Sequence, residues 1–168
     1  MNNCSYKENE IISVLGTTNK IVVVFCPKLM KEINVGIACA THFKIDDGTI
    51  SPGIGIDNEF LILPQFHQEF FMLHEVAHIN NGDVDINSDM TQILLSSRLS
   101  GNIPEMEFIA DKFAYNTLVN KYGIEYVHDI FNDMNKRLKN KLTNTTPNTD
   151  VFTGVNELII RINKLLIE

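Results

Sequence analysis

Two histidines and a glutamate lie within five consecutive residues of this chain, His74-Glu75-Val76-Ala77-His78. On an α-helix, residues four apart lie one turn apart on the same face, so His74 and His78 can direct their imidazole nitrogens at one point. Neutral imidazole is a good ligand for Zn²⁺. Glu75 follows the first histidine directly, so its carboxylate would reach a metal-bound water rather than the metal. The pattern predicts a zinc site with a general base; the alternative is a buried histidine pair on an ordinary amphipathic helix.

Two histidines leave a catalytic zinc ion one protein ligand short. Glu107, on a later predicted helix, can complete the site, and Asp111 lies four residues on, on the same face. Asp111 can then accept a hydrogen bond from the far nitrogen of a ligating histidine, which fixes the orientation of the ring. The small residues Ala110 and Ala114 would let this helix approach the first one closely. The alternative is that both acids are surface residues near a helix start, where negative charge is favourable.

Other zinc sites take their third ligand from residues soon after the second histidine. A third histidine six residues on is excluded, because that position is Val84. Asp83 and Asp85 are also near, but they follow the helix end that Asn81-Gly82 predicts. The third ligand is therefore expected from Glu107, with the two aspartates as the other acids within reach.

The composition of the chain bounds its partners and its compartment. The formal net charge of −7 over 168 residues argues against nucleic acid or an anionic membrane surface as the main partner. The three cysteines follow no close-pair pattern and suit a reducing compartment better than a disulfide framework. No apolar run approaches the roughly 20 residues of a membrane-spanning helix, and the polar N-terminus carries no apolar signal core. We therefore expect a cytoplasmic protein without a membrane span.

Before the motif, the apolar residues favour strands. A β-branched run at residues 21–25 predicts a buried strand, and residues 35–45 predict a second one. The Asp-Asp-Gly sequence at 46–48 is a strong hairpin signal, so the chain should then return antiparallel to the second strand. Pro52-Gly53 is expected to interrupt the returning strand. Residues 60–63 are a further apolar piece, either a strand or the lead into a helix.

From residue 64 onward, apolar residues recur at helical spacing. Phe66, Phe70, Leu73 and Ala77 give the helix that carries the motif an inward-facing stripe. Helices are predicted at residues 5–15, 65–79, 86–99, 104–122, 124–142 and 155–167. We expect one α+β domain over residues 1–168, divided into a mainly β part with a small mixed sheet (1–63), catalytic helices (64–142), a linker (143–153) and a C-terminal helix (154–168).

The ten residues from His74 to Asp83 resemble the active-site signature of the HtpX-like and CAAX prenyl protease family of gluzincin metallopeptidases. In that family H-E-x-x-H is followed by Gly-His or Gly-Asp and then, on a later helix, by E-x-x-A-D. The sequence Glu107-Phe108-Ile109-Ala110-Asp111 resembles the second motif. The resemblance implies a zincin-like fold and peptide-bond hydrolysis. It also implies site roles: zinc ligands His74, His78 and Glu107, general base Glu75, and Asp111 beside a ligating histidine.

The chain departs from that family in two respects. Many family members are integral membrane proteins, so a chain without a spanning helix looks more like the small soluble members called minigluzincins. The family also tends to carry a later His-Pro pair and an arginine, to which only Thr146-Pro147 and Arg161 correspond here. No oxyanion-stabilising role is therefore transferred. The ImmA/IrrE-like regulatory peptidases, which are soluble and of similar size, are the second resemblance.

These features predict a zinc-dependent endopeptidase that hydrolyses a protein or peptide substrate. Zincins bind substrate as an added strand at a sheet edge, which we expect at residues 35–45, with 52–57 as the alternative. His42 and His67 are expected at the surface. The residues that could donate to the oxyanion are Tyr115, Tyr122, Tyr126, His128 and Arg161. A zinc-binding domain without activity, which recognises a partner, is the hypothesis from another class.

Overall fold

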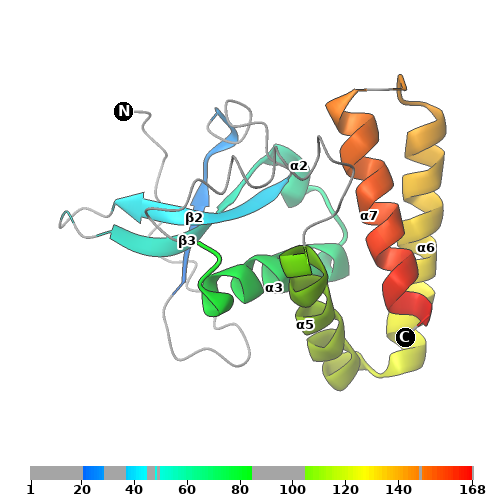
Figure 1. The fold of residues 1–168 in the computed structure, drawn as a ribbon, viewed down its shortest axis with the longest axis horizontal. Coiled ribbons are helices and arrows are strands. Elements are labelled where there is room, and N and C mark those ends of the chain that lie inside the picture. Colours follow the sequence, from blue (N-terminus) through cyan, green and yellow to red (C-terminus); the bar gives the residue numbers. More distant parts are fainter. Residues whose placement is uncertain are drawn as a thin grey trace.

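Three strands form one mixed sheet, β1 (Val22–Phe25), β2 (Ala38–Lys44) and β3 (Ile50–Ile56), in the order β1-β3-β2 (Figure 1). The computed structural model describes residues 21–28, 37–44, 48, 50–84, 105–147 and 149–167. β1 runs parallel to β3, and β2 runs antiparallel to β3. Both predicted strands and the antiparallel return are therefore confirmed. Gly48 has the positive φ of 85° that glycine tolerates in such a turn, whereas residues 45–47 and 49 lie outside the described part.

The expected interruption at Pro52-Gly53 is wrong, because both residues lie inside the continuous strand β3. Proline lacks an N–H, but the pairing of β3 with β1 begins only at Gly53, so no neighbour on that side needs one from Pro52. Gly53 is required by close packing. A Cβ atom there would lie 2.6 Å from the carbonyl oxygen of Val22 and 2.7 Å from the ring of Phe43. Both residues thus fit the strand because of contacts with β1 and β2, which the local sequence does not reveal.

Two helices follow the sheet, α2 (Asn58–Leu61) and α3 (Gln65–Asn81). Asp57 caps α2, since its carboxylate accepts a hydrogen bond of 3.0 Å from the N–H of Phe60. The apolar piece at 60–63 is therefore the end of a helix and a turn rather than a strand. α3 carries the histidine motif and is two residues longer than predicted.

Three long helices complete the described chain, α5 (Glu105–Tyr122), α6 (Ile124–Thr143) and α7 (Asp150–Ile167). Gly123, with a φ of 86°, separates α5 from α6 as predicted. The predicted linker is too long at its C-terminal end, because α7 begins at Asp150. The hydroxyl of Thr149 accepts a hydrogen bond of 3.2 Å from the N–H of Phe152, and such an N-cap starts the helix within the Thr- and Asn-rich segment.

The predicted helices at 5–15 and 86–99 lie outside the described residues. Among the helices that are described, none combines the length and the apolar character that crossing a membrane requires.

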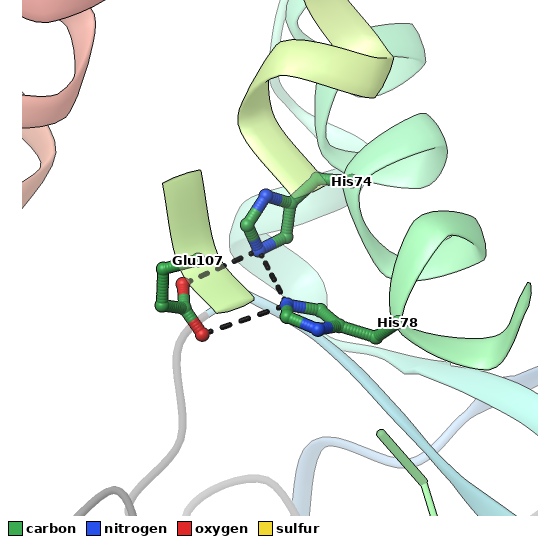
Figure 2. A group of neighbouring side chains, drawn as sticks. All are labelled: His74, His78 and Glu107. Atoms are coloured by element: carbon green, nitrogen blue, oxygen red, sulfur yellow. Dashed lines mark hydrogen bonds and ion pairs between the residues drawn. The ribbon is translucent and has the colours of Figure 1, made fainter. Parts of the chain in front are cut away.

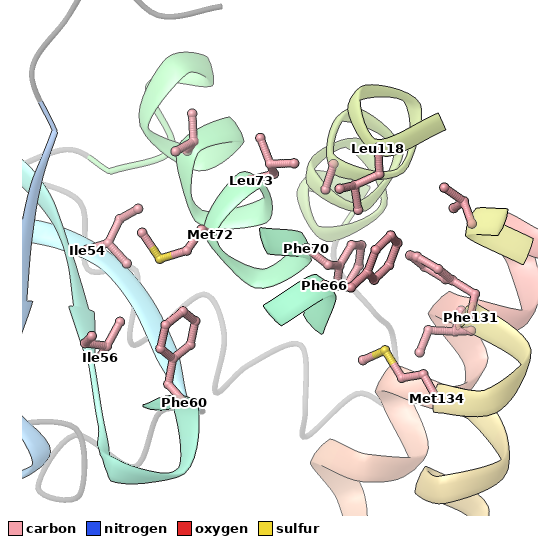
Figure 3. Packing of buried hydrophobic residues seen from close by; sticks show 14 of the residues in the cluster. Ile54, Ile56, Phe60, Phe66, Phe70, Met72, Leu73, Leu118, Phe131 and Met134 are labelled. Carbon is pink, nitrogen blue, oxygen red and sulfur yellow. The ribbon is translucent and has the colours of Figure 1, made fainter. Parts of the chain in front are cut away.

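One cluster of buried apolar residues joins the sheet to the helices, and α3 lies at its centre (Figure 3). Ile54 and Ile56 of β3 are buried on the sheet side of this cluster. On the other side, the ring of Phe131 from α6 packs edge-on against Phe70 and Phe66 of α3, at centroid distances of 5.0 and 6.0 Å. Phe70 in turn lies 6.4 Å from the ring of His74. The core thus packs against both sides of α3, the helix that carries the histidines.

Replacing Phe131 by alanine should lower the free energy of unfolding by about 3–5 kcal/mol, because it leaves a cavity among aromatic rings in a fully buried position. Urea denaturation followed by circular dichroism measures this change. Ile62, which is 83% exposed, provides the control, and Ile62→Ser should change stability by no more than about 0.5 kcal/mol. Equal effects of the two substitutions would contradict the described core.

Candidate metal centre

His74 and His78 lie one turn apart on α3, and both side chains are buried, with 5% and 3% of their surface exposed. Their Nε2 atoms point toward each other at a distance of 3.1 Å (Figure 2). Val76 and Ala77, between them in the sequence, face the core and hold this part of α3 in place. The helical spacing thus produces the convergence of nitrogens that the sequence predicts.

Glu107 of α5 faces both histidines (Figure 2). Its Oε2 lies 3.4 Å from Nε2 of His74, and its Oε1 lies 3.5 Å from Nε2 of His78. The small residues Ala110 and Ala114 on α5 are fully buried, which is consistent with a close approach of α5 to α3. One ligand atom from each of the three residues lies within 4.8 Å of the others, so the group could hold a metal ion.

A carboxylate lies behind each imidazole ring. Asp111 Oδ1 is 2.9 Å from Nδ1 of His74, and Asp83 Oδ2 is 2.9 Å from Nδ1 of His78. An ionised carboxylate only accepts hydrogen bonds, so each Nδ1 carries the proton and donates it. In the neutral form of each ring, Nε2 then presents its lone pair to the centre of the group, which is the tautomer that a metal ligand needs.

The end of α3 explains how Asp83 reaches His78. Gly82 has the left-handed backbone conformation (φ 74°, ψ 18°), which glycine adopts without strain. Its N–H donates to the carbonyl of Ile79, and the N–H of Asp83 donates to the carbonyl of His78, at 3.2 and 3.0 Å. This is the Schellman pattern of helix termination. It turns the chain back so that the Asp83 side chain meets the ring of His78, a role that sequence reasoning missed although the Gly-Asp pair signalled the turn.

Glu75 lies beside the three-residue group, and its side chain is also largely buried. Its Oε2 accepts a hydrogen bond of 2.6 Å from the backbone N–H of Ala40. Ala40 belongs to β2, which is an edge strand of the described sheet. The sheet edge and the motif helix thus meet at the carboxylate predicted to act as base.

Arg161 of α7 reaches the same site from the C-terminal part of the chain. Its Nε and Nη2 donate to the two oxygens of Asp111, each at 2.6 Å, in the forked geometry that guanidinium and carboxylate favour. Its Nη1 lies 2.6 Å from Oε2 of Glu107. The sequence offered Arg161 as an oxyanion candidate and as the counterpart of the arginine in the resembled family, but not as a partner of these two acids. A lone arginine inside the apolar run from residue 158 to 162 was the signal that it faces buried acids.

The close packing of these charges shifts the pKa values of the site. Burial lowers the pKa of His74, but hydrogen bonds with Asp111 and Glu107 outweigh this effect and raise it to about 9. Burial raises the pKa of Glu107, yet its hydrogen bonds with both histidines and the charge of Arg161 hold it well below its usual range. The pKa of Asp111 is likewise lowered, because its hydrogen bonds with Arg161 and His74 outweigh burial. The metal-free site therefore keeps ionised carboxylates beside a protonated histidine.

Four of the five oxyanion candidates make their described contacts away from the metal group. Tyr115 and His128 pair with each other at 2.6 Å. Tyr122 donates to Glu69, and the ring of Tyr126 packs on that of Tyr122. Arg161 is the candidate whose described contacts include the metal group, but its three donor nitrogens already contact Asp111 and Glu107.

His42 and His67 are not part of the metal group. His42 is half-buried on β2, opposite Pro52. The expectation that His67 lies at the surface is wrong, since only 7% of it is exposed. Burial lowers the pKa of His67, as does the nearby charge of Arg137, while Asp133 opposes the shift. The helical stripe of α3 did not reveal that this side of the helix is also covered.

No known family model, curated protein or solved structure matches this chain.

Replacing Asp83 by alanine should weaken binding of Zn²⁺ by about 10–100-fold, because the ring of His78 loses the acceptor that fixes its tautomer. Competition with a chromogenic chelator measures the affinity. Asp133→Ala is the matched control, since it removes one negative charge from an exposed ion pair on α6. If both variants bind Zn²⁺ as tightly as the unmodified protein, Asp83 has no part in orienting His78.

Binding of Zn²⁺ at pH 7 should release about one proton or more, because a metal ion must displace the proton of His74, whose pKa is about 9 without metal. As the pH rises through 9, His74 becomes neutral before the metal arrives, so its contribution to proton release should disappear. Titration calorimetry in buffers of different ionisation enthalpy measures the number of protons. Binding at pH 7 without proton release would contradict the described charge state.

Proposed function

We propose that this protein is a zinc-dependent endopeptidase in which Glu75 acts as general base. The observation that carries the proposal is the convergence of His74, His78 and Glu107 beside a second, separately held glutamate at a sheet edge. A metal site alone requires only the three ligands. The additional carboxylate is what hydrolysis needs.

The donor set and its spacing favour zinc. Two imidazoles and one carboxylate are a ligand set typical of catalytic zinc, and three protein ligands leave a fourth position open. A tetrahedral zinc ion with ligand bonds of 2.0–2.1 Å needs ligand atoms about 3.3–3.4 Å apart. The two Nε2 atoms lie 3.1 Å apart, close to this spacing, and each has a different oxygen of Glu107 within 3.5 Å. Taken as one atom from each residue, the three ligand atoms lie within 4.8 Å of one another. The negative charge of the surrounding acids further favours a divalent cation.

Within this proposal each residue has a separate task. Bound zinc would supply a Lewis acid for the scissile carbonyl and would make water more acidic. Glu75 accepts the proton of the attacking water and returns it to the leaving amide nitrogen, a role typically worth about 10²–10⁴-fold in rate. Asp111 and Asp83 hold the two rings in the ligating tautomer. Arg161 fixes the carboxylates of Asp111 and Glu107.

The sheet topology supports β2 as the strand that receives the substrate. β3 pairs with strands on both sides, so the alternative edge at residues 52–57 is an internal strand. The N–H of Ala40 donates to Glu75, so it points away from β3. In an antiparallel pair, alternate residues share this outward orientation, so Ala38 and His42 also present backbone groups to the edge. A peptide added there as a further strand would pass Glu75.

Glu75→Gln should retain about one zinc ion per chain but lose at least ~10²-fold in the rate of peptide hydrolysis, because the amide cannot accept the proton. Elemental analysis and cleavage of a mixed peptide library measure the two quantities. Glu105→Gln provides the matched control, since Glu105 is exposed at the start of α5, and it should keep both zinc and activity.

Three results would contradict the proposal in different ways. A protein that binds zinc but cleaves no member of the library would be a zinc-binding domain of another function. A Glu75→Gln variant as active as the unmodified protein would remove Glu75 from the mechanism. A protein that binds no zinc, or that binds it equally well after His74→Ala, would overturn the site itself.

A further inference from the structure

A pair of polar residues lies in the apolar interface between α6 and α7, which run side by side in opposite directions (Figure 1). Asn135 of α6 is 6% exposed, and its Nδ2 donates to Oδ1 of Asn163 on α7 at 2.6 Å. Within the described part of the chain, the Oδ1 of Asn135 has no hydrogen-bond partner. A buried amide with an unpaired oxygen costs stability, so it needs an explanation other than packing.

The apolar residues of α7 do not by themselves fix how far it slides along α6. Buried residues recur at positions 155, 159, 162 and 165, so a shift by one helical turn again places apolar on apolar. The positions three and four residues from Asn163 are all isoleucine or leucine, at 159, 160, 166 and 167. Any one-turn shift would therefore set the amide of Asn135 against a hydrocarbon side chain and leave it without a partner. The hydrogen bond between the two asparagines can form in one register only, much as a single buried asparagine fixes the register of a coiled coil.

The register of α7 decides where Arg161 lies. Arg161 precedes Asn163 by two residues, so the two side chains leave the helix about 200° apart, with the fully buried Ile162 between them. One faces α5 and the other α6. A shift of one helical turn would move Arg161 by about 5.4 Å along the helix axis. The three contacts of 2.6 Å to Asp111 and Glu107 would not survive such a displacement.

We infer that Asn135 and Asn163 are positioning residues of the metal centre, which set the register of α7 and thereby hold Arg161 against Asp111 and Glu107. Lys164 adds a second contact to α5, its Nζ lying 3.8 Å from the centroid of the Phe108 ring. That contact tolerates sliding better than a forked hydrogen bond does, so it cannot replace the asparagine pair. The position of Arg161 follows from described contacts alone, whereas its consequence for zinc rests on the proposed function.

The test follows the side-chain Nε–H of Arg161 by nuclear magnetic resonance in the full-length protein. The chain has three arginines, so the signal can be assigned through Arg161→Lys. In the unmodified protein this Nε–H should exchange with water more slowly than that of Arg137, which is bound to Asp133 at the surface. In the double variant Asn135→Leu/Asn163→Leu the slow exchange should be lost. The midpoint temperature of thermal unfolding should not fall, because leucine replaces both polar side chains in the interface.

The control is Met134→Leu, a volume-conserving change at a buried neighbour of Asn135, which should leave the exchange slow. Asn163→Ala, at a half-buried position, serves as the second variant should the double leucine protein not fold cooperatively, and it should also lose the slow exchange. Slow exchange at Arg161 that survives the loss of the asparagine pair would overturn the inference. So would a rapidly exchanging Arg161 in the unmodified protein.

Zinc titration separates this inference from the proposed function. The asparagine variants and Arg161→Met should each bind Zn²⁺ more weakly, by up to about 10–100-fold. Combining them should add nothing to the loss caused by Arg161→Met, since the pair acts through Arg161. Additive losses of zinc affinity would contradict the inference that the asparagine pair acts through Arg161. If the unmodified protein binds no zinc, the proposed function fails, while the exchange of the Arg161 Nε–H still decides whether the asparagines position it.

Discussion

The carboxylate of Asp111 is the contact on which the site depends, because it joins three helices that are distant in the sequence. It is fully buried, and it accepts hydrogen bonds from His74 of α3 and from the fork of Arg161 on α7. An unpaired buried carboxylate would be costly, so α5 is stable in this position only while both partners are present. The same contacts that satisfy Asp111 also orient a metal ligand, so the packing of the helices and the chemistry of the site share their determinants.

Two occupants compete for the centre of the site. With both Nδ1 atoms donating to carboxylates, the two Nε2 atoms at 3.1 Å cannot both face each other as free acceptors. A proton or a cation has to lie between them. The pKa of about 9 for His74 means that a proton takes this place in the metal-free protein at neutral pH. A divalent ion would replace it and offset more of the negative charge of the surrounding acids.

The residues found by spacing were those whose partners are set within one helix. His74 and His78 are four apart, as are Glu107 and Asp111, and helical geometry alone places each pair on one face. The contact between Arg161 and Asp111 was not predicted, because the two residues lie 50 positions apart and only the docking of α7 brings them together. The burial of His67 was missed for the same reason, since the apolar stripe of α3 does not show that other elements also cover this side of the helix. The α+β class and the strands could be predicted from the local sequence pattern. That Pro52-Gly53 does not interrupt β3 could not, because it depends on where β1 begins to pair.

The site therefore requires almost the whole described chain. β2 holds Glu75, α3 and α5 supply the metal-ligating group, and α7 supplies the arginine that neutralises two of its acids. A ligand that binds only this assembled arrangement stabilises it by mass action. A metal ion bound here would therefore also stabilise the docking of α7, since Glu107 contacts both the metal group and Arg161. In the metal-free protein, protonated His74 and Arg161 together provide the positive charge that keeps the acids buried, which explains how the centre can be assembled before the ion arrives.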